Sequence, residues 1–293
     1  MSGKKIGVFD SGLGGLSVLR CLTAFFPAES FVYFGDNSSA PYGDMSLRRL
    51  RQKAFEGLIF LLSFNVKAVV VACNTLSVNC LSFLKTVSPV PVVGVFPPVE
   101  GALMRGEKTL LLSTPKTAEY YGNNPSLYNR LSIYPLRRLA GEIECYAKSS
   151  APFIRPCFAA RKTSAEKGKP LAALKPAKRE SAAFVCENPP VFSPFDNLKP
   201  LCPPRTFDTV ILGCTHYFFA SENIFEHFCP QKIYGGEIFT CFALNRVLNK
   251  MGKNKINRKN IAISKILFVG KCGIINKNFW LKHVKRGIKT DNY

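Results

Sequence analysis

Val69-Val70-Val71-Ala72-Cys73-Asn74-Thr75 decides the fold, because Val210-Ile211-Leu212-Gly213-Cys214-Thr215-His216 follows the same plan later in the chain. In each stretch an aliphatic run predicts a buried parallel strand, a small residue lets the backbone turn, and a cysteine opens a helical segment. Ligands of open α/β sheets bind beyond the carboxyl ends of such strands. We therefore expect Cys73 and Cys214 to occupy equivalent places in a ligand site.

Composition predicts a globular protein. The chain has 293 residues, 47% of them hydrophobic, which is enough to fill one large or two modest domains. No apolar signal-type region precedes Lys4-Lys5-Ile6-Gly7-Val8, and no uncharged run of about 18 residues or more could span a bilayer. We therefore expect a cytoplasmic protein with no membrane contact.

The cysteines and the net charge bear on disulfide bonding, metal binding and nucleic-acid binding. Eleven cysteines are scattered without regular spacing and form no C-x-x-C pair, so reduced thiols and no bound metal are expected. The net charge of +21 raises nucleic acid as a partner. Much of the charge lies in residues 155–179 and 250–289, without a recognisable nucleic-acid motif. A solvated basic surface is therefore the favoured interpretation, and nucleic acid stays open.

The first predicted strand offers a place for a charged ligand. Lys5-Ile6-Gly7-Val8-Phe9 leads into Asp10-Ser11-Gly12-Leu13-Gly14-Gly15-Leu16, whose glycines fit neither standard nucleotide-binding pattern. At this strand end Asp10 can hold an ammonium group, and Ser11 with nearby backbone N–H groups can hold a carboxylate. Capping of the next helix by Asp10 is the alternative.

A second predicted strand, residues 31–34, leads to a loop over residues 35–44 with the turn chemistry of functional surface loops. Tyr42 and Gly43 are the candidates within it, and a plain turn is the alternative. Asp44 then is expected to cap a long amphipathic helix.

Strands alternate with helical segments along the chain, which predicts an α/β fold of two pseudo-symmetric doubly wound domains with parallel sheets and an active site at their interface. We expect residues 1–95, completed by about 236–293, to form the first domain, and residues 96–235 to form the second. If Ser113 corresponds to Asp10, the spacing to the cysteine is 63 residues in the first half and 101 in the second. The excess of 38 falls in a basic, Pro-rich insertion at about 150–204, which is expected to be disordered and dispensable for chemistry.

These motifs together resemble those of glutamate racemase, of the cofactor-independent aspartate/glutamate racemase superfamily. The resemblance covers about residues 1–149 and 205–250. The residues that carry it are Ile6 to Leu16, Asp36 with Pro41-Tyr42-Gly43, Ala72-Cys73-Asn74-Thr75, and Leu212-Gly213-Cys214-Thr215-His216-Tyr217.

The resemblance implies roles for individual residues. Cys73 and Cys214 match the two catalytic cysteines, and Asp10 and His216 are the candidates for positioning their protons. A family glutamate follows a proline by seven residues, which selects Glu142 after Pro135, although Arg137-Arg138 depart from the family pattern. The positions that match substrate-binding ones are Asp10, Ser11, Pro41, Tyr42, Gly43, Asn74, Thr75, Thr215 and His216.

Two thiols suit the implied chemistry. Inverting Cα without a cofactor requires a base on one face of the substrate and an acid on the other, so the pair must flank it. The expected activity is interconversion of L- and D-glutamate without metal or cofactor, supplying D-glutamate for peptidoglycan synthesis. The alternatives are racemisation of aspartate, or a catalytically weak relative that acts as a binding protein.

Some features depart from the family or extend beyond it. Leu76 replaces a small residue, Phe218 replaces a proline, and the basic insertion has no family counterpart, so activity could be reduced. The resemblance also leaves open a homodimer and a contact with DNA gyrase, since some family members are thought to bind it.

Overall fold

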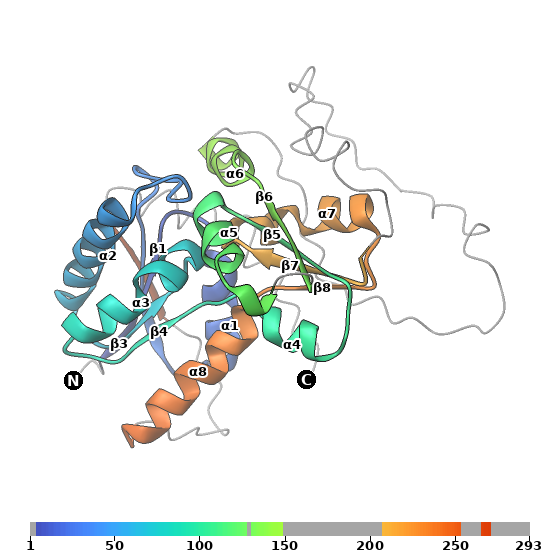
Figure 1. Ribbon diagram of the computed structural model, residues 1–293. Helices are drawn as coiled ribbons and strands as arrows, with labels where there is room; N and C mark the ends of the chain where they lie inside the picture. Colours follow the sequence, from blue (N-terminus) through green and yellow to red (C-terminus); the bar gives the residue numbers. More distant parts are fainter. Residues whose placement is uncertain (1–3, 128–129, 149–206, 253–264, 271–293) are drawn as a thin grey trace, which may run out of the picture.

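The computed structural model describes residues 4–127, 130–148, 207–252 and 265–270 (Figure 1). In these ranges the chain forms two parallel β-sheets with helices packed around them. The basic insertion at 150–204 lies outside the described residues, as does most of the basic region 250–289.

The first sheet has five strands in the order β4-β3-β1-β2-β9. Because β9 pairs with β2, the chain returns to this sheet near its C-terminal end. The strands are β1 (Lys5–Asp10), β2 (Ser30–Gly35), β3 (Val66–Val71), β4 (Val92–Gly94) and β9 (Lys265–Val269), and the helices are α1 (Leu16–Phe25), α2 (Leu47–Leu62), α3 (Asn74–Val87) and α8 (Glu237–Lys250).

The second sheet has four strands in the order β6-β5-β7-β8. Its strands are β5 (Thr109–Ser113), β6 (Leu131–Pro135), β7 (Thr209–Gly213) and β8 (Lys232–Tyr234). Its helices are α4 (Val99–Met104), α5 (Pro115–Gly122), the 3-10 helix η1 (Pro125–Leu127), α6 (Leu139–Lys148), the 3-10 helix η3 (Thr215–Ala220) and α7 (Ser221–Phe228).

The two strand orders are the same when the sheets are read from corresponding ends. β2, β1, β3 and β4 of the first sheet correspond to β6, β5, β7 and β8 of the second. The chain order reverses between β1 and β3, and again between β5 and β7, which are the crevices where doubly wound sheets bind ligands. The predicted fold class of two pseudo-symmetric parallel sheets is therefore confirmed, whereas the exact domain limits stay a prediction.

Local sequence explains the elements that hold the site. β1 and β3 are almost entirely buried, as expected for central parallel strands covered on both faces. α2 buries Leu50, Ala54, Leu58 and Leu61, which lie three or four residues apart on one helix face. Its N-cap is Ser46, whose Oγ accepts a hydrogen bond from the Arg49 backbone N–H at 3.3 Å, so the expectation that Asp44 caps this helix is wrong.

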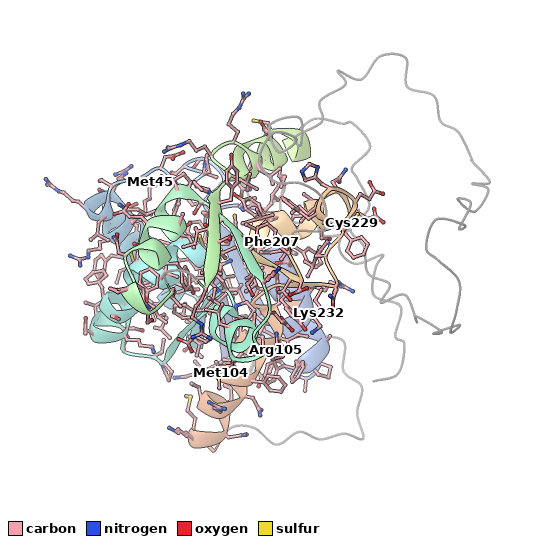
Figure 2. The ribbon with its side chains drawn as sticks, turned by 45° about the vertical axis from the view of Figure 1, so that its right-hand side comes forward. Met45, Met104, Arg105, Phe207, Cys229 and Lys232 are labelled. Carbon is pink, nitrogen blue, oxygen red and sulfur yellow. The ribbon has the colours of Figure 1, made fainter. Side chains whose placement is uncertain are left out.

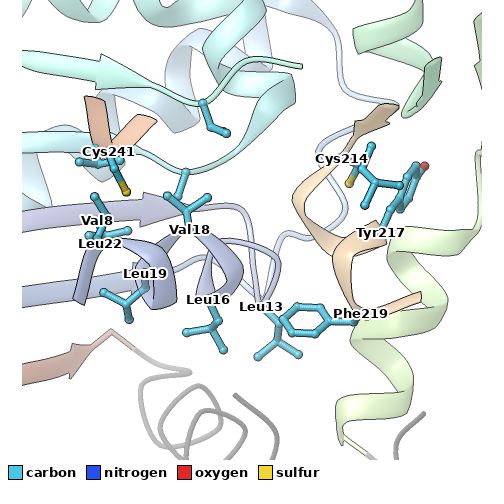
Figure 3. Close-up of a cluster of buried hydrophobic side chains, with 14 of the residues drawn as sticks. Val8, Leu13, Leu16, Val18, Leu19, Leu22, Cys214, Tyr217, Phe219 and Cys241 are labelled. Atoms are coloured by element: carbon cyan, nitrogen blue, oxygen red, sulfur yellow. The ribbon is translucent and has the colours of Figure 1, made fainter. Parts of the chain in front are cut away.

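A continuous apolar core joins the two sheets. It includes Leu13, Leu16 and Leu19 from the first half together with Tyr217 and Phe219 from the second. Figure 3 shows Leu13 beside the ring of Phe219, with the Tyr217 ring on the same η3 segment. The loop after β1 is thus held against η3 by apolar contact, and this brings the ends of β1 and β7 into one region.

An ion-pair cluster fixes the outer edge of the second sheet. The Glu107 carboxylate, just before β5, binds Lys232 Nζ at 2.5 Å and Arg105 Nε at 2.8 Å. Figure 2 labels Lys232 and Arg105. It also accepts a hydrogen bond from Thr209 Oγ1 at 2.6 Å. These contacts tie the starts of β5, β7 and β8 together, at the end of the sheet opposite Cys214.

A surface groove of about 620 Å³ lies between α3, β4 and α8, and its lining includes Lys85 and Arg246. Its lining includes neither Cys73 nor Cys214. Within the described ranges, no helix combines the length and the apolar run needed to cross a bilayer.

Candidate active site

The two thiols occupy equivalent positions. Cys73 follows β3 and is the N-cap of α3, and Cys214 follows β7 and is the N-cap of η3. Both have extended backbone angles, and their exposed fractions are only 5% and 7%. Each sulfur therefore lies at the carboxyl end of a strand, beside a helix N-terminus, as the sequence predicts.

The first thiol lies among polar groups of β1 and α3. Its sulfur is 3.6 Å from Ser11 Oγ. Burial and the charge of Asp10 raise the pKa of Cys73 to about 12, although hydrogen bonds from the Leu76 backbone N–H and Ser11 lower it. The charge of Cys214 adds a smaller rise.

Two buried oxygens beside Cys73 lack a hydrogen-bond donor among the described residues. They are Asp10 Oδ1 and Asn74 Oδ1. The other Asp10 oxygen, Oδ2, accepts a bond from the Gly12 backbone N–H at 2.8 Å. Burial raises the pKa of Asp10, and the charge of His216 and the backbone N–H groups of Gly15 and Gly12 offset this rise only in part. Buried acceptors normally find donors, so this pair is suited to receive an ammonium group.

A buried chain of hydrogen bonds supports the second thiol. Cys214 Sγ is 3.7 Å from His216 Nδ1, and His216 Nε2 is 2.7 Å from Glu144 Oε1. Burial lowers the pKa of His216, but the hydrogen bonds with Cys214 and Glu144 raise it well above its ordinary value. Burial likewise raises the pKa of Glu144, yet its bonds to His216 leave it lowered. An imidazolium paired with a carboxylate is the form that these shifts favour.

The glutamate at His216 is Glu144, whereas the sequence prediction selected Glu142. The structure places Glu142 in an ion pair with Arg138 Nε at 3.3 Å, and burial raises the pKa of Glu142. α6 buries Leu139, Ala140, Ile143 and Glu144 on one face, so helical periodicity could have pointed to Glu144 as the glutamate that contacts His216.

Threonines from the second half meet the predicted substrate residues of the first. Thr75 Oγ1 lies 2.9 Å from Thr114 Oγ1, and Thr114 in turn donates to Thr117 Oγ1 at 3.1 Å. The backbone N–H of Lys116 donates to the Gly43 carbonyl at 3.0 Å. Thr114 and Thr117 were not predicted as site residues, although the equivalence of Ser113-Thr114 with Asp10-Ser11 pointed to this turn.

The loop with Pro41, Tyr42 and Gly43 is held in place by hydrogen bonds to the Asp36 carboxylate. Tyr42 donates its hydroxyl hydrogen to Asp36 Oδ2 at 2.8 Å, and Lys53 Nζ binds the same oxygen at 2.9 Å. The Tyr42 phenol is thus engaged, and its ring is buried. This segment can offer its backbone groups to a ligand, while Pro41, which follows a cis peptide bond, and Gly43 shape the turn.

The departures from the family pattern fit into the site without displacing its polar groups. Leu76 is fully buried in a core cluster that also contains Cys73 and Tyr42. Phe218 is partly buried against the main core, with its ring 5.4 Å from that of Phe219. Thr215 and Ser11 are also buried, each with an exposed fraction of 3%. In the parts of the chain that the structure describes, no group of three metal-binding side chains comes together.

Gly14 is required by the close approach of the two halves. A Cβ added there would lie 2.5 Å from both His216 Nδ1 and Thr215 Oγ1. We expect Gly14→Ala to displace His216, to lower kcat at least 10-fold and to reduce the free energy of unfolding by about 1–3 kcal/mol. Gly122→Ala is the matched control, since a Cβ there meets no atom within 4 Å. Activity and unfolding temperature measure both effects, and a fully active Gly14→Ala protein would contradict the geometry.

Comparison with known proteins gives the family. No family model matches the chain. A curated glutamate racemase from Oceanobacillus iheyensis is 31% identical over 235 residues, which cover 80% of this chain and 73% of that protein.

Solved structures agree with this relationship. Glutamate racemase from Thermus thermophilus, in complex with beta-chloro-D-alanine, is 26% identical with a TM-score of 0.63, over 94% of this chain and 93% of that one. A glutamate racemase isoform from Bacillus anthracis has a TM-score of 0.66 over 96% and 94% of the two chains, and its 24% identity supports the fold alone. The sequence relationship over four-fifths of the chain and the shared two-sheet fold show that this chain belongs to the glutamate racemase family.

Proposed function

We propose that the chain interconverts L- and D-glutamate by a two-thiol mechanism, in which Cys73 and Cys214 act on opposite faces of Cα. The observation that carries this proposal is the equivalent placement of the two buried sulfurs at the ends of β3 and β7. Each sulfur has its own polar support, Asp10 and Ser11 on one side and His216 with Glu144 on the other.

The substrate ammonium group would bind Asp10 Oδ1 and Asn74 Oδ1, which lack donors among the described residues. Its charge would offset the negative charge of Asp10, which raises the pKa of Cys73 in the empty site. Substrate binding therefore favours the thiolate that the reaction needs.

The substrate carboxylates would use hydroxyls and backbone N–H groups. Ser11, Thr75 and Thr215 all lie at strand-to-helix turns, where backbone N–H groups favour anions. Tyr42-Gly43, from the first half, borders this region and contacts the second half through the hydrogen bond from the Lys116 backbone N–H to the Gly43 carbonyl.

The proton balance is complete with two sulfurs. One thiolate takes the Cα proton and becomes a thiol, and the electron pair left on Cα spreads into the α-carboxylate. The opposite thiol then gives its proton to the other face of Cα and becomes a thiolate. Between turnovers His216, protonated and held by Glu144, can return a proton to Cys214 and regain one from solvent, while the first thiol releases to solvent the proton that it took. These steps restore the starting protonation states without a metal or cofactor.

Substrate entry requires the two halves to move apart, because both sulfurs and their polar neighbours are buried. Closure then excludes water and brings Thr75 and Thr114 together around the substrate. D-glutamate formed in this way would supply peptidoglycan synthesis in the cytoplasm. A homodimer and a contact with nucleic acid or DNA gyrase stay predictions.

The test is incubation of the purified protein with L-glutamate in deuterated water. We expect D-glutamate to form with deuterium at Cα, without added pyridoxal phosphate and after dialysis against a chelator. Parallel incubation with L-aspartate measures the preference between the two acidic amino acids. Racemisation that disappears on dialysis, or that requires pyridoxal phosphate, would reject the mechanism.

A further inference from the structure

Asn37 joins the first half of the molecule to the proton-handling groups of the second. It lies in the loop between β2 and α2, and its exposed fraction is 1%. Its side-chain Nδ2 donates a hydrogen bond to Glu144 Oε2 at 2.8 Å. Burying an amide and a carboxylate costs free energy unless they are hydrogen-bonded, and these two groups lie 107 residues apart in the sequence. The role of this long-range hydrogen bond therefore calls for an explanation.

The bond decides how the Glu144 carboxylate is oriented. Glu144 Oε1 accepts bonds from the Leu13 backbone N–H at 2.6 Å and lies 2.7 Å from His216 Nε2. Among the described residues, Asn37 supplies the hydrogen bond to the other oxygen, Oε2. Donors on both oxygens fix the rotation of the carboxylate about its terminal bond, so that Oε1 stays directed at His216.

We propose that Asn37 is a positioning residue for racemisation, acting through Glu144 and His216 on proton transfer at Cys214. This inference rests on the two-thiol mechanism proposed above. It also implies that seating of the loop with Tyr42-Gly43 and assembly of the Cys214 side are linked, because Asn37 lies in the same loop as these residues.

Other titratable groups face the same cluster. Asp10 from β1 interacts electrostatically with both His216 and Glu144. Burial, the charge of Asp10 and the charge of Glu144 all raise the pKa of Tyr33 from β2. Cys214, the N-cap of η3, faces His216. These groups are shared by the wild type and the Asn37 variants, so a difference between the proteins reports the hydrogen bond itself.

Two variants with nearly the shape of asparagine test the role. Asn37→Leu removes the donor, and Asn37→Asp replaces it with a carboxyl that donates only when protonated. We expect each to lower kcat about 10- to 100-fold near pH 8, with KM changed less than about 3-fold. Ser38→Ala is the control in the same loop, because it removes only an exposed bond to Asp36, and its kcat should stay within about 2-fold of the wild type.

The pH profile separates positioning from a structural role. In Asn37→Asp, the protonated carboxyl can donate to Glu144 Oε2, whereas the ionised form repels it. The ratio of variant to wild-type kcat should therefore rise as the pH falls from about 8 to about 5.5. Asn37→Leu should show no such rescue. Unfolding temperatures, measured at each pH, identify any contribution from loss of the fold.

Isotope effects locate the affected step. If proton transfer at Cys214 is slowed, glutamate deuterated at Cα should show a larger isotope effect for the enantiomer that Cys214 deprotonates and a smaller one for its mirror image. A structural defect would lower both rates and leave the two isotope effects unchanged. The role of Asn37 is overturned if the wild type racemises glutamate and both Asn37 variants do so with wild-type kinetics. It is also overturned if the wild type is active and the isotope effects of the variants are unchanged. Absence of racemisation in the wild type would overturn the proposed function instead.

Discussion

Cys73→Ser and Cys214→Ser should each lower the rate of glutamate racemisation by about 10²- to 10⁴-fold, because in the proposed two-thiol mechanism each removes the acid or base on one face of Cα. A serine hydroxyl keeps nearly the same shape but ionises too weakly to replace a thiolate. The two sulfurs occupy equivalent strand ends, so the effects of the two substitutions should be of similar size. The measurement is the conversion of L-glutamate and of D-glutamate, followed separately for each variant.

Cys229→Ser is the matched control for the loss of a thiol. Cys229 is exposed at the end of α7, and its sulfur binds only the Glu226 carbonyl among the contacts described, at 3.4 Å (Figure 2). Its activity should stay within about 2-fold of the wild type. Each catalytic variant should also keep one-sided chemistry, such as elimination from a glutamate that carries a leaving group at Cβ, because that reaction needs a base on one face alone. Substantial racemisation by either serine variant would contradict a mechanism with two thiols.

The fold was accessible to sequence analysis because its evidence is local and repeated. The β-branched run before Cys73 and the aliphatic run before Cys214 each predict a buried strand, and the order of the motifs predicts two similar halves. The strand orders of the two sheets confirm this correspondence, including the pairing of Asp10 with Ser113 as the last residues of β1 and β5. The residues at the carboxyl end of each strand could therefore be identified from the sequence without knowledge of the tertiary structure.

Contacts between the halves were harder to predict because they depend on side-chain direction. The spacing from Pro135 selected Glu142, but Glu144, on the buried face of α6, is the glutamate whose carboxylate lies 2.7 Å from His216 Nε2. Asn37 gave no local signal, since an asparagine in a polar loop is normally a turn residue. Its partner is a carboxylate in the other half, which only the packing of the two sheets reveals.

Glu144→Gln should lower kcat by roughly 10²-fold or more, whereas Glu142→Gln should change it by less than about 5-fold. The two substitutions are chemically identical and lie two residues apart on α6, so they form a matched pair. Glu144 holds His216, and its loss removes the negative charge that raises the pKa of His216. Glu142 binds the exposed side chain of Arg138, an interaction that solvent screens. The reverse order of effects would restore Glu142 as the functional glutamate.

The pH dependence of stability gives this prediction a second measurement. The pKa of Glu144 is lowered in the folded protein, so its contribution to stability is present above its ordinary value of 4.5 and is lost as the pH falls through the folded value. The pKa of His216 is raised, so its contribution is present below 6.5 and is lost as the pH rises through the folded value. The difference in unfolding temperature between the wild type and Glu144→Gln should therefore be largest between about pH 4.5 and 6.5 and should narrow on either side. For Glu142, whose pKa is raised, the wild type should lose stability relative to Glu142→Gln as the pH rises through the ionisation of that carboxyl, and no maximum should appear in that window. A flat difference for Glu144→Gln would show that Glu144 and His216 are not charged partners in the folded protein.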